Sequence, residues 1–243
     1  ATSVNADGAA LGAYAEKQGY EKPFMLLDTT IAYDHGLCDG FKKGFDGDEA
    51  GQATFKNGDA SISSQIADIK SSGADSVVMC TYQPGGASAL RQIRSAGIDL
   101  PLLAGGSFDG SFWMEGIPDV SNLYVAAMAS VFGNDPNPAV NEFVKEYEQA
   151  YGEPPLISYA VASYSVGEAL VKALEATGGS TDGDALKEAL EGFEDEQLLV
   201  GPTTFTEEAH IELKRPLVIL ETTKGKADVV DRVAPDVEIG IAG

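Results

Sequence analysis

Residues 61–80 read SISSQIADIKSSGADSVVMC and contain a helix followed directly by a strand. The three isoleucines of this segment recur at helical spacing, which predicts a helix over 61–72 with one apolar face. Gly73 supplies the residue type that most often ends a helix. The apolar run within 75–80 is short and uninterrupted, which is typical of a strand buried on both faces of a sheet.

The same alternation continues on both sides of this segment. Asn5 can cap a first helix and Gly19 can end it. The expected strands are 23–28, 50–56, 100–104 and 123–131, and the expected helices are 6–18, 33–45 and 84–96. Strands that alternate with helices predict a parallel sheet covered on both faces, which is an α/β fold.

The pattern changes after residue 132. A turn-rich link at 133–138 leads into three helical patterns at 139–151, 159–176 and 182–190. No strong strand candidate follows until 217–220. We expect a helical stretch without a sheet of its own to cover a sheet made elsewhere.

The composition narrows the class of protein. Hydrophobic residues make up 44% of the 243 residues, as in an ordinary soluble globular protein. No apolar run approaches the about 18–20 residues that a membrane helix needs, so we expect no membrane span. The 38 acidic residues outnumber 16 basic ones, and the net charge of −22 argues against a nucleic-acid partner. A salt-tolerant source and an ordinary acidic secreted protein both fit this charge.

The cysteines and histidines predict no metal site. Cys38 and Cys80, with His35 and His210, match no zinc-ligand spacing. Two half-buried thiols are the expected state of the cysteines, with a disulfide as the open alternative. The first residues are polar and do not resemble a signal peptide, which fits either a mature chain or a fragment.

Catalytic patterns are missing from the sequence. Residues 106–110 read GSFDG, which is not the G-x-S-x-G elbow of hydrolases because the second glycine comes one place late. There is no P-loop, and no G-x-G-x-x-G follows a strand. We therefore predict a protein that is not an enzyme, with no catalytic residues and no cofactor.

Several segments together resemble a known family. These are AYDHGL at 32–37, QIADIK at 65–70, LRQIR at 90–94, and FVK at 143–145 followed by YGEPP at 151–155. Each segment is weak alone, but their order is similar to that of type I periplasmic solute-binding proteins. The similarity is to the branched-chain amino-acid (Leu/Ile/Val) receptors of ABC transporters.

The resemblance implies a two-lobed α/β fold in which parallel sheets are flanked by helices and three crossing strands join the lobes. Residues 1–127 would form a complete-looking second lobe, and 128–211 the helical part of the first lobe. Residues 212–243 would return to the second lobe. The N-terminal lobe would then be incomplete in this chain.

The resemblance also implies a function. The protein would capture a small polar organic solute, an amino acid or a related carboxylate or amide, between its lobes by hinge closure. Its partners would be this solute and the membrane permease of an ABC transporter, and the complete protein would be monomeric. The expected location is periplasmic or extracellular, with a lipid anchor in the full-length protein left open. The alternative is the ligand-sensing domain of a signalling receptor or regulator with the same fold.

Three tyrosines are candidates for the solute site. In a parallel α/β sheet the ligand lies outside the carboxyl ends of the strands, which selects the loops after residues 27, 80 and 104. Tyr33 and Tyr82 follow the first two of these ends. The resemblance implies that both face the cleft and that Tyr159, at the start of a later helix, supplies a third aromatic ring.

The loop after residue 104 supplies the remaining candidates. The resemblance aligns Gly106 with an acidic residue that takes the ammonium group of amino-acid ligands. Either Asp109 reaches the site instead, or the ligand has no amine there, and Ser107 and Phe108 then contact a neutral or anionic solute. The alternative interpretation of this loop is a glycine turn that caps the next helix.

Overall fold

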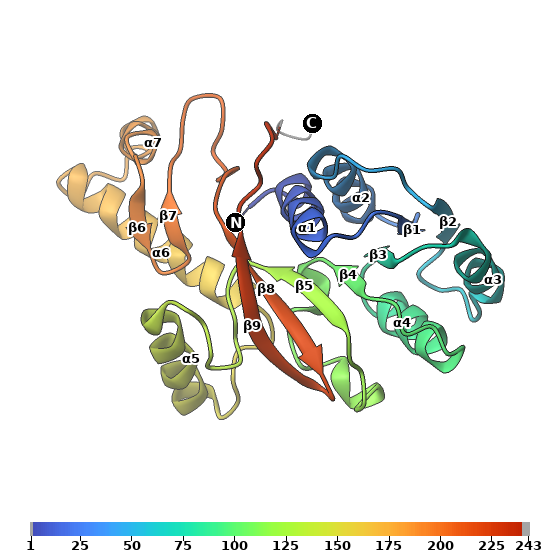
Figure 1. Cartoon of the computed structure of the whole chain (residues 1–243). Helices are drawn as coiled ribbons and strands as arrows, with labels where there is room; N and C mark the ends of the chain where they lie inside the picture. The colour runs from blue at the N-terminus through green and yellow to red at the C-terminus, as the bar shows by residue number, and fades with distance from the viewer. Residues whose placement is uncertain (1, 240–243) are drawn as a thin grey trace.

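A seven-stranded sheet forms the centre of the structure, a computed structural model that describes residues 2–239 (Figure 1). Its strand order is β2-β1-β3-β4-β5-β8-β9, and all pairs from β2 to β5 are parallel. The pairs β5–β8 and β8–β9 are antiparallel. The strands are β1 (Pro23–Asp28), β2 (Gly51–Phe55), β3 (Ser76–Cys80), β4 (Leu102–Ala104), β5 (Leu123–Ala127), β8 (Leu217–Thr223) and β9 (Lys226–Val233).

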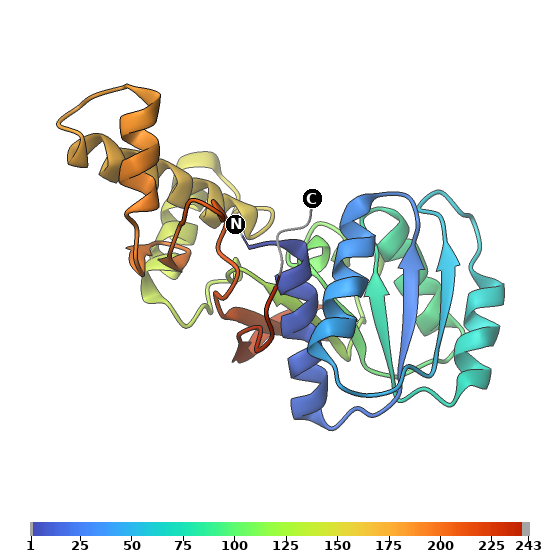
Figure 2. The same cartoon turned by 90° about the horizontal axis from the view of Figure 1, so that it is seen from above.

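Helices cover both faces of this sheet, as the alternating pattern predicts (Figures 1 and 2). Helices α1 (Val4–Gln18) and α2 (Ala32–Gly44) pack on one face, where Leu11 and Phe41 join the strand residue Met25 in one apolar cluster. Helices α3 (Ser63–Ser72) and α4 (Gly85–Ser95) cover the other face through apolar side chains that include Ile69 and Leu90. The mixed α/β fold is confirmed.

Glycines let α1 and α2 pack at very short range. A Cβ atom added to Gly8 would lie 2.2 Å from the carbonyl oxygen of Leu37, and one added to Gly44 would lie 2.2 Å from that of Ala9. Neither position has room for a side chain, so the two helices are held backbone against backbone. This contact fixes α2, whose first turn carries Tyr33.

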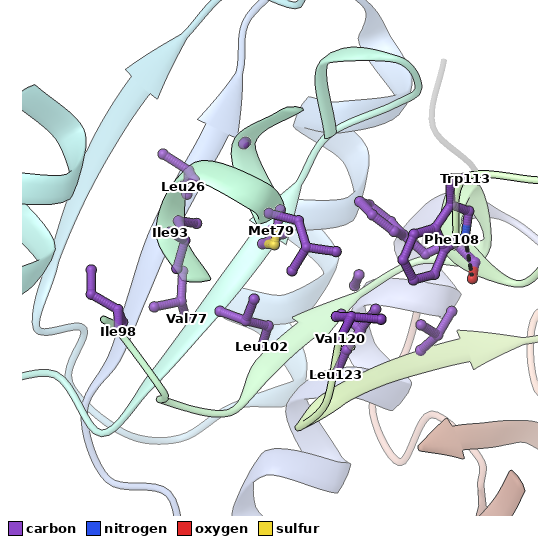
Figure 3. Packing of buried hydrophobic residues seen from close by; sticks show 14 of the residues in the cluster. Leu26, Val77, Met79, Ile93, Ile98, Leu102, Phe108, Trp113, Val120 and Leu123 are labelled. Carbon is purple, nitrogen blue, oxygen red and sulfur yellow. Dashed lines mark hydrogen bonds between the residues drawn. The ribbon is translucent and has the colours of Figure 1, made fainter. Parts of the chain in front are cut away.

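The core on the opposite face extends beyond the strands into the loop after β4 (Figure 3). The rings of Phe108 and Trp113 meet edge to face with centroids 5.3 Å apart. The indole N–H of Trp113 donates a hydrogen bond of 3.1 Å to the carbonyl of Phe108. The loop is therefore anchored from within the core.

A second part of the chain stands away from this sheet, as Figure 2 makes plain. It contains α5 (Pro138–Tyr151), α6 (Tyr159–Ala176), α7 (Gly183–Glu191) and a small antiparallel hairpin of β6 (Glu196–Leu198) and β7 (Gly201–Thr203). This part has its own apolar cluster, which includes Val140, Val161 and Phe193. Among residues 2–239, no helix combines the length and the apolar character that crossing a membrane requires.

Several expected boundaries were wrong. The strand predicted over 123–131 ends at Ala127, where the chain leaves the sheet. The β6–β7 hairpin and β9 were missed. Each strand of the hairpin has only three residues, and charged residues interrupt the apolar ones in β9. Ser3, not Asn5, caps α1 by accepting a hydrogen bond of 3.2 Å from the N–H of Ala6. Asn5 lies inside the helix.

Cys38 and Cys80 form a disulfide, so the expectation of two thiols was wrong. The bond joins α2 to the last residue of β3, across 42 residues of sequence. Because α2 lies directly over this strand, the two Cα atoms are only 5.6 Å apart. The sequence carries no local signal for this proximity.

Candidate functional site

Tyr33 and Tyr82 lie side by side at the carboxyl ends of β1 and β3. Tyr33 belongs to the first turn of α2, and Tyr82 follows β3 by two residues. Their rings meet edge to face, with centroids 5.7 Å apart and an interplanar angle of 79°. Tyr82 is the outer ring of the pair, with 41% of its surface exposed. Two strand ends thus bring two tyrosine rings to one surface.

The hydroxyl of Tyr33 is buried and has no hydrogen-bond partner among the described residues. Burial raises the pKa of Tyr33 well above its ordinary value, and the negative charge of Asp7 adds to this effect. The backbone of Ser107 lies close enough to oppose this rise in pKa in part. Tyr33 is therefore a neutral phenol whose O–H donates to no described residue. Such a group gains most from a partner of complementary polarity.

The loop after β4 packs against this tyrosine pair. A Cβ atom added to Gly105 would lie 2.6 Å from the hydroxyl oxygen of Tyr33. The Ser107 hydroxyl donates a 2.8 Å hydrogen bond to the carbonyl of Thr81, beside Tyr82. Ser107 is buried, so its side chain connects the two loops and does not present its hydroxyl to solvent.

The other candidates of this loop have different surroundings. Gly106 has open space beside it, since an added Cβ atom would approach no atom closer than 3.6 Å, the nearest being Oδ2 of Asp109. Phe108 is buried in the core against Trp113 (Figure 3). The expectation that Phe108 contacts the solute is therefore not supported by its packing.

Asp109 is fully buried and links this loop to α6. Its Oδ2 atom accepts hydrogen bonds from the hydroxyl of Ser158 and, at 3.3 Å, from the Ser158 N–H. Its Oδ1 atom has no partner among the described residues. Burial raises the pKa of Asp109 to about 7, and the hydrogen bonds from Ser158 oppose this shift in part.

Tyr159 is the first residue of α6 and directly follows Ser158. It is 39% exposed. Burial raises the pKa of Tyr159, with further contributions from the charges of Asp7 and Asp109 and from Tyr82. The hydrogen bonds of Ser158 with Asp109 place this start of α6 beside the loop after β4.

Asp7 of α1 is an acid that sequence reasoning did not select, and its charge acts on the tyrosines. Burial raises the pKa of this α1 carboxyl to about 6, although the Thr2 hydroxyl donates a 2.6 Å hydrogen bond to it. Asp7 and Asp109 both contribute to the raised pKa of Tyr33 and of Tyr159. Two acids, Asp7 and the fully buried Asp109, thus act on the tyrosines, and negative charge near these rings favours a positively charged or N–H-bearing group over an anion.

Under the tyrosines lies a buried polar network. Asp28 is fully buried and accepts hydrogen bonds from Thr30, Asn57 and Thr81. Asp34 is also fully buried, and neither of its carboxylate oxygens has a partner among the described residues. Burial, together with the charge of Asp28, raises the pKa of Asp34 to about 7.

The positions of possible metal ligands among the described side chains also bear on the chemistry of the site. Within residues 2–239, no group of three or more His, Cys, Asp and Glu side chains is arranged to hold a metal ion. His210 pairs with Glu191 of α7 at 2.7 Å, and His35 lies exposed on α2.

The sequence matches a known protein family over most of its length. Residues 1–227 match the periplasmic binding protein family. The chain belongs to this family. It is 24% identical over 200 residues to Leu/Ile/Val-binding protein homolog 3 of Brucella melitensis, covering 80% of this chain and 52% of the relative. It is 30% identical over 139 residues to homolog 7 of Brucella abortus, covering 53% of this chain and 33% of the relative. The chain thus spans about half or less of these relatives.

Solved structures of similar fold point to the same family. The substrate-binding protein LivJ of Streptococcus pneumoniae, in complex with isoleucine, superposes with a TM-score of 0.83 at 22% identity, covering 96% of this chain and 66% of LivJ. A solute-binding protein of an ABC transporter from R. palustris, in complex with benzoate, gives a TM-score of 0.78 at 25% identity, covering 95% of this chain and 63% of that protein. The fold is therefore that of type I periplasmic binding proteins.

Proposed function

We propose that this protein is an extracytoplasmic solute-binding protein of an ABC transporter. The observation that carries the proposal is the edge-to-face pair of Tyr33 and Tyr82 at two strand ends. The hydrogen bonds from Ser158 to Asp109 bring the start of α6, where Tyr159 lies, to the neighbouring loop after β4. Tyrosine rings offer a flat apolar face and one hydroxyl each, which suits the capture of a small polar organic molecule. The relatives of this chain are binding proteins, which supports binding over catalysis.

The solute in this proposal is an amino acid or a related carboxylate or amide. Asp109 keeps one buried carboxylate oxygen without a partner, and Asp7 adds a second acid. A solute that presents an ammonium or amide N–H group would satisfy this oxygen. The two ligands seen in similar structures, isoleucine and benzoate, differ in whether they carry an amine. Their relative affinities would therefore test the role of the acids.

We also propose how the chain is divided between the two lobes. Residues 1–127 and 212–243 would form the second lobe, and 128–211 the helical part of the first lobe. In support, Val166 and Leu170 of α6 are 65% and 47% exposed and border an apolar cavity of about 250 Å³. The parallel sheet of the first lobe is the occupant that we propose for this face, since an exposed apolar face of this kind favours a partner surface.

The proposed mechanism is hinge closure. A solute that contacts both Tyr82 of the sheet lobe and Tyr159 of α6 would stabilise the closed arrangement through its greater affinity for that state. The membrane permease would then recognise the closed shape.

Calorimetry with Tyr82→Ala tests the site. In a full-length version of the protein, we expect this change to weaken binding of L-isoleucine or benzoate by about tenfold or more, a loss of at least about 1.4 kcal/mol. The matched control is Tyr164→Ala, because Tyr164 is an exposed tyrosine of α6 that should not affect binding. Equal affinity of wild type and Tyr82→Ala would remove Tyr82 from the site.

The lobe assignment has its own test. If 128–211 completes a lobe whose sheet lies outside this chain, the 243-residue chain alone should bind these solutes weakly. Tight binding by this chain would contradict the assignment and leave the tyrosine site intact.

A further inference from the structure

Asn57 follows β2 and makes hydrogen bonds with both ends of its side-chain amide. Its Nδ2 donates to the carbonyl of Tyr82 and to Oδ2 of Asp28, both at 2.8 Å. Its Oδ1 accepts from the N–H of Gly85 at 3.1 Å. One amide therefore connects the end of β1, the loop that carries Tyr82 and the start of α4.

Asn57 is itself held in place. Its backbone N–H donates a 3.0 Å hydrogen bond to the hydroxyl of Thr30, and that hydroxyl donates a 2.6 Å hydrogen bond to Oδ1 of Asp28. Asp28 is fully buried and accepts hydrogen bonds on both of its carboxylate oxygens. Because every member of this chain of hydrogen bonds has a partner, the network can act as a rigid support.

The backbones of Asn57 and α4 are also too close for a side chain at Gly85. A Cβ atom added to Gly85 would lie 2.6 Å from the carbonyl oxygen of Asn57 and 2.7 Å from its Cα atom. Glycine at this position lets the two backbones touch. The turn after β2 and the first residue of α4 therefore move as one unit.

Tyr82 depends on this unit for its position. Its carbonyl accepts hydrogen bonds from Asn57 Nδ2 and from the N–H of Gly86, while its ring is 41% exposed. The position of an exposed ring depends mainly on the backbone that carries it, and the Tyr82 ring packs against that of Tyr33. A shift of this backbone would move the Tyr82 ring away from the Tyr33 ring.

We infer that Asn57 is a positioning residue of the solute site, which holds the loop of Tyr82 so that its ring meets Tyr33. This inference rests on the proposed function for its consequence in binding. The orientation of Tyr82 can nevertheless be measured without any solute.

The test uses the 243-residue chain labelled with 3-fluorotyrosine, in which each of the nine tyrosines gives a fluorine signal. The Tyr82 signal is assigned by its loss in Tyr82→Phe. We expect Asn57→Ala to shift and sharpen this signal, because the ring loses its fixed place against Tyr33. Buried Tyr14 of α1, whose ring packs with that of Tyr124, serves as an internal reference that should not move.

Gln65→Ala is the matched control. Gln65 also donates a hydrogen bond from a side-chain amide to a backbone carbonyl, that of Thr54 at 2.7 Å, but it does not contact the Tyr82 loop. Its removal should leave the Tyr82 signal unchanged. An unchanged Tyr82 signal in folded Asn57→Ala would overturn the inference, as would an equal shift in the control.

Two further measurements keep the test decisive. If Asn57→Ala does not fold, Thr30→Val removes the hydroxyl that holds the Asn57 N–H and should shift the same Tyr82 signal to a smaller extent.

In a full-length version, calorimetry with L-isoleucine and benzoate should give about tenfold weaker binding for Asn57→Ala. If wild type binds neither probe, the proposed function loses support, while the fluorine signals still decide the role of Asn57. A shifted signal with unchanged affinity would overturn the part of the inference that concerns binding.

Discussion

Oδ2 of Asp109 accepts hydrogen bonds from both the hydroxyl and the backbone N–H of Ser158, a residue 49 positions further along the chain. The carboxyl belongs to the loop after β4, and Ser158 directly precedes α6. The pair therefore joins the sheet to the helix that begins with Tyr159. Because Asp109 is fully buried, this junction should respond to pH.

Asp109→Asn should change the pH dependence of stability. Burial raises the pKa of Asp109 from 3.8 to about 7, so the folded chain holds this proton more tightly than the unfolded chain. This contribution to the free energy of unfolding is therefore present at low pH and is lost as the pH rises from about 4 to about 7. Its upper limit is about 4 kcal/mol, and the neutral asparagine should remove it. Urea unfolding followed by Trp113 fluorescence measures the difference.

Asp7 and Asp34 have raised pKa values as well, so they add pH dependence of the same sign to both proteins. The difference between wild type and Asp109→Asn isolates the one carboxyl. Ser158→Ala provides a second check, because loss of its hydroxyl should raise the pKa of Asp109 further and steepen the dependence. Parallel curves for wild type and Asp109→Asn would contradict this account of Asp109.

Replacement of both cysteines should destabilise the part of the chain that contains the seven-stranded sheet. The disulfide between Cys38 and Cys80 closes a loop with a sequence separation of 42. In the chain-entropy model, the Cys38→Ala, Cys80→Ala double variant should lose about 4 kcal/mol in free energy of unfolding. Urea unfolding of oxidised wild type and of the double variant gives this value. A difference near zero would mean that the unfolded chain gains little freedom without the bond.

Gly105→Ala should disturb Tyr33. The added methyl group would lie 2.6 Å from the hydroxyl oxygen of Tyr33 and 3.0 Å from both Cδ atoms of Leu37. Overpacking of this kind typically costs about 1–3 kcal/mol. The control is Gly116→Ala, since no atom lies within 4 Å of a Cβ added there. Thermal unfolding should separate the two variants, and equal midpoints would show that the Tyr33 ring moves aside without cost.

Salt should stabilise the folded chain. With a net charge of −22, repulsion between acidic side chains opposes the compact state, and added ions screen it. We expect the urea midpoint to rise between about 0.1 M and about 1 M sodium chloride, where the screening length falls from about 10 Å to about 3 Å. A midpoint that stays constant would remove the support for a salt-tolerant source.

The sequence predicts the sheet because each buried strand is a short apolar run bounded by turn residues. The rule that ligand sites lie at strand ends also selects the loops of Tyr33 and Tyr82, and the structure brings these two rings together. Their role in binding stays a prediction. Phe108 belongs to the same set of loops but turns back into the core against Trp113, which the strand-end rule does not foresee.

Other features depend on contacts that have no local signature. Asn57 lies in a polar turn of ordinary composition, and only the fold brings it to Tyr82, 25 residues away. The disulfide depends in the same way on where α2 lies over β3. The strand β9 was missed because it is an edge strand in which charged residues interrupt the apolar ones, so it lacks the apolar run of a central strand.

Ala127 at the end of β5 pairs directly with Val218 near the start of β8. The chain therefore leaves the sheet and re-enters it at neighbouring backbone positions, with α5, α6, α7 and the β6–β7 hairpin between them (Figure 1). An excursion with adjacent entry and exit points leaves the pairing of β5 with β8 unbroken, and the buried hydrogen bonds between Asp109 and Ser158 attach it to the sheet side a second time. A change of length between β5 and β8 would therefore be tolerated by the two strands but constrained by the need to keep Ser158 opposite Asp109.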